Sequence, residues 1–241
     1  MTEQIDALVR LARAIAATPV ESPLSLRMCE ACVDILGVDG GSFTLAYADP
    51  ERVTLCATDE GAAQLEDLQE VFGEGPSYTA YTERTIQTLS VDGAVDLRWP
   101  LLSDAVRQAM ASCTIYAIPM KPGPQTMGVA TFYQQQPGPL LVDGPTLQLL
   151  INAVGVALVK DPDVLDDDRY AKADSWNSRA RIHQASGMVM AQLRLTPDDA
   201  MALIRAHAYA HRQTLAAISD EIIARSLDFR TTDPDPGNGQ P

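Results

Sequence analysis

The chain of 241 residues is long enough for one large domain or two domains of ordinary size. Hydrophobic residues make up 46% of it and charged residues 21%, which excludes disorder throughout. The net charge of -14 excludes a protein that coats nucleic acid or an anionic membrane along its whole length. Residues 1–168 carry 9 basic and 24 acidic side chains, whereas residues 169–230 carry 9 basic and 6 acidic ones. The C-terminal segment is therefore the part suited to a polyanionic partner.

The apolar stretches are too short or too polar to span a membrane, which takes about 20 apolar residues. One of the longest, 147–159, contains Gln148 and Asn152. The sequence starts Met1-Thr2-Glu3 and lacks the basic and apolar regions of a secretory signal. We therefore expect a cytoplasmic protein.

The first 160 residues predict an α+β domain. Apolar residues at helical spacing predict a helix over 3–17, and Ser22 and Pro23 predict the start of a second helix that ends at Leu36 before Gly37. Two β-rich runs on either side of residues 48–51 predict a hairpin. Strands are expected over 42–47, 52–57, 113–119 and 126–133, and further helices over 62–72, 103–110 and 146–159. Strand pairs and helices in this order predict an antiparallel sheet flanked by helices.

An acidic segment separates this domain from an all-helical one. Residues 161–168 (DPDVLDDD) are too acidic for a core and predict a linker. Thr196 and Pro197 have the residue types of an N-cap and a first helical position. The predicted divisions are a domain over 1–160, a linker over 161–168, a helical domain over 169–230 and a disordered tail over 231–241, with helices over 169–193, 197–211 and about 214–227.

Residues with metal or catalytic chemistry are few. Cys29 and Cys32 form a CxxC inside a helical stretch, with no second CxxC and no nearby His, which favours structural cysteines over metal or redox chemistry. His207 and His211 have a spacing that suits a metal, but the local sequence offers no clear third ligand, which favours a surface or interface role. We find no GxSxG, Gly-rich phosphate loop or HExxH, so neither an enzyme nor a cofactor is expected.

Motifs in all three C-terminal helices carry a specific signature. They are IHQASGMVM at 182–190, LTPDDAMALIRAHAY at 195–209 and LAAISDEII at 215–223. Over about 173–229 the chain resembles the ANTAR domain, a three-helix RNA-binding module of bacterial transcription antiterminators, and residues 225–229 look like the end of actinobacterial members. Ser186 and Gln213 stand where this family often has Lys and Arg, which leaves phosphate contacts at these two positions open.

The residues give this resemblance a physical basis. Arg205, Tyr209 and Arg212 share one face of the second helix, where the ring could stack on an unpaired base while the cations meet phosphates. A solvated face is the alternative. The outer surface of the first helix is a second candidate, with Arg179, Arg181, His183 and Arg194.

The small core of this bundle is predicted from helical spacing. The expected core positions are Ile182, Ala185, Ser186, Val189 and Leu193 in the first helix and Ala200, Leu203, Ile204 and Ala208 in the second. Gly187 lowers helix stability by about 1 kcal/mol relative to Ala, and we expect it to allow close approach of another helix.

Several pieces of residues 5–160 resemble a GAF domain of the kind that is fused to ANTAR modules. They are GEGP at 73–76, Trp99-Pro100, CTIYAIP at 113–119 and MGVATFY at 127–133. The resemblance implies a GAF-like sheet domain, followed by a long helix and the three-helix bundle. It also implies sensing or dimerisation without naming a ligand. Ser77 stands where many relatives have Cys, which argues against thiol chemistry there.

Together, the resemblances imply an RNA-binding antitermination regulator. A sensory GAF-like domain, with an unidentified small-molecule ligand if any, would control an output that binds hairpin loops in nascent RNA. A small-molecule sensor that acts through protein partners, with the C-terminal helices as a dimerisation arm, is the alternative. A homodimer through paired helices is predicted from an apolar edge that is formed by Tyr170, Ala173, Trp176 and Ala180. Packing of this edge onto the chain's own first domain is the alternative.

Overall fold

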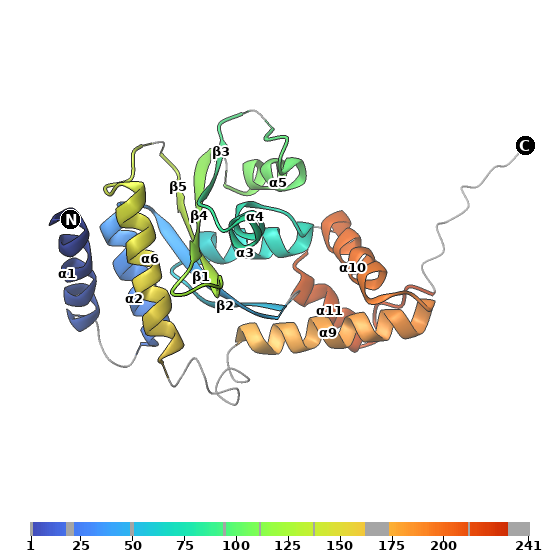
Figure 1. Cartoon of the computed structure of the whole chain (residues 1–241). Helices are drawn as coiled ribbons and strands as arrows, with labels where there is room; N and C mark the ends of the chain where they lie inside the picture. The colour runs from blue at the N-terminus through green and yellow to red at the C-terminus, as the bar shows by residue number, and fades with distance from the viewer. Residues whose placement is uncertain are drawn as a thin grey trace, which may run out of the picture. The chain divides into compact units, whose positions relative to one another are not determined.

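The computed structural model forms two compact units, Met1–Ser175 and Trp176–Pro241. Among the described residues, all strands belong to the first unit (Figure 1). None of the helices described combines the length and apolar character needed to cross a membrane. The structure describes residues 2–17, 22–48, 51–93, 95–110, 112–136, 138–161, 174–211 and 213–230.

The first unit is built on a five-stranded antiparallel sheet in the order β2-β1-β5-β4-β3. The two predicted strand pairs, β1 with β2 and β4 with β5, are confirmed. β1 and β5 pair from Gly40 opposite Tyr133 to Leu45 opposite Gly128, which joins the two pairs into one sheet. The strands are β1 (Gly40–Ala48), β2 (Glu51–Ala57), β3 (Gln87–Val91), β4 (Cys113–Met120) and β5 (Gly128–Gln134).

Helices cover both faces of the sheet (Figure 1). One face carries α2 (Leu24–Leu36) and α6 (Gly144–Val159), and α1 (Thr2–Ala17) packs on these two helices. The other face carries α3 (Glu60–Phe72), α4 (Pro76–Glu83) and α5 (Pro100–Met110). The α+β fold with a flanked antiparallel sheet is therefore confirmed.

The largest core lies between the sheet and α2 and α6. Phe43 of β1 and Phe132 of β5 meet edge to face there, with ring centroids 6.4 Å apart. Cys29 and Cys32 are fully buried in the same core, so the CxxC lies within a helix. A hydrogen bond with Cys56, together with burial, raises the pKa of Cys29, and burial raises the pKa of Cys32. Both thiols are therefore poor nucleophiles, as expected for structural cysteines.

The structure corrects several predicted boundaries. Pro23 occupies the N-cap of α2 rather than its first turn, although Gly37 ends this helix in the predicted left-handed conformation with φ of 69°. The sequence patterns did not predict the helix α4 or the strand β3. α4 is only eight residues long and has no pronounced apolar face, and β3 is a five-residue strand at the edge of the sheet.

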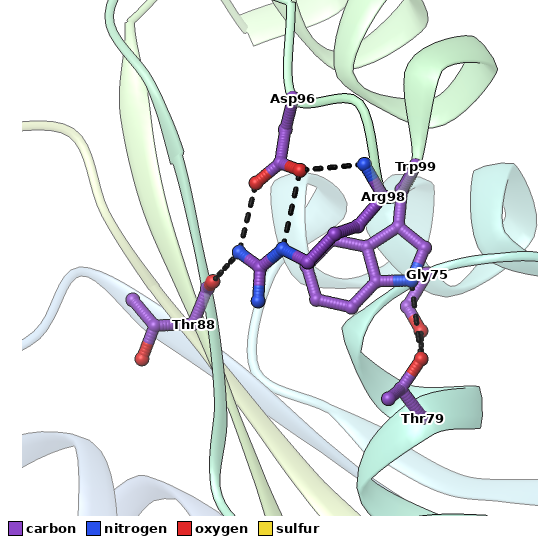
Figure 2. Close-up of polar contacts among 6 residues, drawn as sticks. All are labelled: Gly75, Thr79, Thr88, Asp96, Arg98 and Trp99. Carbon is purple, nitrogen blue, oxygen red and sulfur yellow. Dashed lines mark hydrogen bonds and ion pairs between the residues drawn. The ribbon is translucent and has the colours of Figure 1, made fainter.

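The loop between β3 and α5 is fixed by Arg98. Its guanidinium donates hydrogen bonds of 2.8 and 3.2 Å to Asp96 and one of 2.9 Å to the Thr88 carbonyl of β3 (Figure 2). These bonds hold the pKa of Asp96 below its usual value. Arg98 also lies over Trp99, 4.2 Å from the ring centroid. The Trp99 indole donates to Thr79 at 3.1 Å, which ties this loop to α4.

Candidate nucleic-acid interface

The second unit contains α9 (Asp174–Leu193) from Trp176 onward, α10 (Pro197–His211) and α11 (Leu215–Ile223). Residues 169–173 and 231–241 lie outside the described part, and α11 is shorter than the predicted helix over 214–227. The predicted core positions are buried except Leu193 and Leu203, which are half-buried. The buried side chains are Ile182, Ala185, Ser186 and Val189 of α9, Ala200, Ile204 and Ala208 of α10, and Leu215, Ile218, Ser219 and Ile222 of α11.

The start of α10 follows from its sequence. The Thr196 hydroxyl accepts the Asp199 backbone N–H at 3.2 Å and donates to the Asp199 carboxylate at 2.7 Å. Pro197 occupies the first helical position, where its missing N–H costs no hydrogen bond. Asp198 and Asp199 lie at the positive end of the helix dipole. The predicted helix start is confirmed, and this cap fixes where the rest of α10 begins.

The candidate RNA-binding face on α10 joins a cation and an exposed ring. Arg205 is half-buried, and its Nε is buried with no hydrogen-bond partner in the part of the chain described. Tyr209, one helical turn further, is 55% exposed. Arg212 lies outside the described residues. A large exposed ring beside a guanidinium can stack on a base while the cation pairs with a phosphate.

The candidate residues of the first helix differ in their surroundings. Arg181 forms an ion pair with Asp220 and so links α9 to α11. His183 is exposed, and position 179 lies one turn before it on the same flank, although the Arg179 side chain lies outside the described part. Arg194 follows the end of α9, exposed and in the left-handed conformation with φ of 56°. Arg181 therefore has a structural partner that its sequence context did not reveal.

Three further positions of the bundle, Gly187, Ser186 and Gln213, bear on the expectations from the sequence. Gly187 is exposed, and a Cβ atom there would meet no atom of the described chain within 4 Å, so the expected close helix approach is wrong. Ser186 is 6% exposed and belongs to the core, where a phosphate contact is not available. Gln213 donates from Nε2 to Glu221 Oε1 at 3.0 Å, which joins the loop before α11 to that helix.

An aromatic stack lies on another part of α10. The rings of His207 and His211 are stacked, with centroids 4.0 Å apart, and Phe229 meets His207 edge-on at 5.3 Å. Burial and the neighbouring His211 lower the pKa of His207, against an opposing effect of Glu221. Across the described ranges, no three His, Cys, Asp or Glu side chains are grouped to hold a metal. The i,i+4 spacing indicated the His pair, but no local signal indicated Phe229.

Comparison with known families identifies the C-terminal bundle. Residues 174–223 match the family model of the ANTAR domain. The chain therefore carries an ANTAR domain, and RNA binding and transcription regulation are the roles of that family. A comparison with curated proteins gives no match.

Solved structures with similarity to the chain include GAF domains. The nlh2 GAF domain of A. Aeolicus, in an inactive state, is 12% identical with a TM-score of 0.43, covering 64% of this chain and 91% of that one. The GAF domain of an Acinetobacter phosphoenolpyruvate-protein phosphotransferase is 16% identical with a TM-score of 0.44, covering 65% and 94%.

The aromatic stack predicts a pH effect on stability. The lowered pKa keeps His207 neutral in the folded chain, whereas unfolding returns it to about 6.5, so unfolding takes up a proton as the pH falls. This contribution to stability is complete above about pH 6.5 and is lost as the pH falls through and below that value. Melting temperatures by circular dichroism from about pH 8 to about pH 5 should fall less steeply for His207→Phe than for the parent. Equal slopes in the parent and the variant would contradict the assignment.

Proposed function

We propose that this chain is a cytoplasmic regulator of transcription antitermination that acts without covalent chemistry. Its GAF-like domain senses a signal, and its ANTAR domain binds hairpin loops in nascent RNA. The observation that carries the proposal is the exposed Tyr209 ring one turn from Arg205, on a helix of the matched ANTAR domain. The surplus of basic side chains in residues 169–230 supports the same partner.

Regulation requires only that binding favours one RNA fold over another. Preferential binding to the antiterminator hairpin shifts the RNA population away from the competing terminator hairpin. A differential of about 3 kcal/mol changes the ratio of the two folds roughly 100-fold. The net negative charge of residues 1–168 disfavours RNA contact by the first domain and assigns binding to the ANTAR domain.

A homodimer fits this function. On the first unit, α1 exposes Ile5 (58%) and Val9 (40%) at i,i+4 spacing, and α6 exposes Leu149 (36%) and Val156 (41%) at i,i+7 spacing. α1 and α6 pack on each other, so these apolar side chains lie on neighbouring helices. Two ANTAR domains in one dimer would bind two loops of one RNA, and the second contact would benefit from a high effective concentration.

Arg205→Ala should weaken binding to an RNA that carries tandem short hairpins. The change removes one cation, so the slope of log affinity against log salt should flatten by about one counterion. Arg212→Ala should behave in the same way. Filter-binding titrations at several salt concentrations measure both effects, with Arg10→Ala on α1 as the control that should leave binding unchanged. Normal folding with parental binding in both variants would move the interface to Arg179, Arg181, His183 and Arg194.

Tyr209→Ala should lose about 1–3 kcal/mol of RNA-binding free energy because a base no longer stacks on the ring. The salt slope should stay at the parental value, since no charge is removed. Tyr209→Phe keeps the stacking surface and is the matched control. A Tyr209→Ala chain that binds hairpin RNA like its parent would remove the ring from the interface. A parent chain that binds no hairpin RNA at all would favour the protein-partner alternative.

Light scattering at micromolar concentration should give twice the mass of the 26.0 kDa chain. Val9→Glu and Val156→Glu place charges on the exposed apolar faces of α1 and α6 and should shift the mass toward the monomer. Gln64→Glu, on the exposed side of α3, adds the same charge elsewhere and should leave the dimer intact. A clean monomer of the parent chain contradicts the dimer.

A further inference from the structure

Polar side chains lie buried on the side of the N-terminal sheet that α3 and α4 cover. The strands contribute Ser42 and Thr44 of β1, Thr54 of β2 and Thr131 of β5, and the helices contribute Glu66 and Gln69 of α3 and Ser77 of α4. All are at most 8% exposed except Thr54, which is half-buried. A sheet face under two helices is normally apolar, as the opposite face of the same strands is. This polar cluster therefore needs an explanation.

Most hydrogen-bonding groups of the polar cluster satisfy one another. Ser42 donates to Glu66 at 2.8 Å, and the Thr44 and Thr54 hydroxyls bond at 3.1 Å. The Ser77 and Thr131 hydroxyls bond at 2.8 Å, and the Ser77 backbone N–H donates to Gln69 Oε1 at 2.9 Å. The last bond fixes the orientation of the Gln69 amide, because its oxygen must face the N–H of Ser77.

Two donors of this region have no acceptor in the described chain. Gln69 is 1% exposed, and its Nε2, with both hydrogens, has no partner. Arg52 Nη2 on β2 is likewise buried and unpartnered. The Arg52 guanidinium lies over the Tyr78 ring, 4.1 Å from its centroid, and Tyr78 follows Ser77, which bonds Gln69. Both donors therefore flank the Ser77-Tyr78 segment of α4. Buried donors left without acceptors are unfavourable, so their retention points to an absent acceptor.

We infer that the polar cluster binds a small organic carboxylate, which names the ligand class for the proposed sensory role. Both unpartnered groups are donors, and one is cationic, so the missing partner is an acceptor with negative charge. Arg52 supplies the one positive charge among these unpartnered donors, which disfavours a dianion such as phosphate and suits a monoanionic carboxylate group. Arg52 and Tyr78 are half-buried and Arg52 belongs to the edge strand β2, so the ligand would enter there.

The chain contains a fluorescent reporter for this site. Trp99 donates to Thr79 of α4, two residues from Ser77, as Figure 2 shows. Trp176→Phe in the full-length chain leaves Trp99 as the only tryptophan. Sodium acetate and sodium pyruvate are titrated against sodium chloride at equal ionic strength. We expect a saturable change in Trp99 fluorescence and a raised melting temperature with at least one carboxylate. No response beyond that of chloride overturns the inference.

Gln69→Glu separates binding from folding. It keeps an oxygen for the Ser77 N–H and replaces both Nε2 hydrogens by a carboxylate oxygen, so carboxylate affinity should fall by about tenfold to 100-fold. Gln64→Glu makes the same change at an exposed position of the same helix and should bind like the parent. Where circular dichroism shows that Gln69→Glu does not fold, Arg52→Leu provides the test, with the same expected loss. Undiminished carboxylate binding in the folded variant overturns the inference.

The same variants separate this inference from the proposed function. Hairpin RNA is titrated against Gln69→Glu and the parent without added carboxylate. Because the substitution lies in the first unit, parental RNA binding together with lost carboxylate binding supports the site. A parent that binds RNA but no carboxylate overturns only the carboxylate site, whereas one that binds carboxylate but no RNA overturns only the proposed output.

Discussion

The alternation of side chains along β1 and β5 separates the main apolar core from the buried polar cluster on the other side of the N-terminal sheet. Because neighbouring side chains point to opposite faces, Phe43 and Phe132 enter the apolar core while Ser42 and Thr131 enter the polar cluster. A slip of one residue would place the rings against Glu66 and the hydroxyls in the core. The β1–β5 register therefore determines both the main core and the candidate ligand site.

The C-terminal bundle is subject to a different constraint, the small size of its core. Ala185, Ala200 and Ala208 are fully buried and bring the helices close, but each buries little apolar area. Burying a further large ring would therefore add to the stability of this bundle. Tyr209 nevertheless remains 55% exposed on α10, and the Arg205 Nε beside it has no partner among the described residues. This arrangement fits the proposed stacking and charge-pairing role.

Local chemistry made much of the fold predictable. The Thr196 cap and the Gly37 helix end depend on neighbouring residues only, and the strand pairs follow from short turns. The ANTAR helices were recognisable because their motifs are local too. Contacts between distant segments were not predictable: Arg181 with Asp220, Phe229 on His207, and Gln69 with Ser77 depend on tertiary packing. The candidate RNA face was predictable as a helical spacing, but the polar cluster required the packed sheet.

The proposed dimer offers a physical route from a weak signal to a large response. A ligand can change RNA affinity only by the ratio of its affinities for the two conformational states of the protein. A carboxylate held by one guanidinium and one amide makes few contacts, so a ratio of about tenfold, or about 1.4 kcal/mol, is a reasonable scale. When two ANTAR domains bind two loops of the same RNA, the ratios of the two sites multiply to about 100-fold. That product corresponds to the differential of about 3 kcal/mol between RNA folds considered above, so dimerisation would let modest sensing produce a large shift.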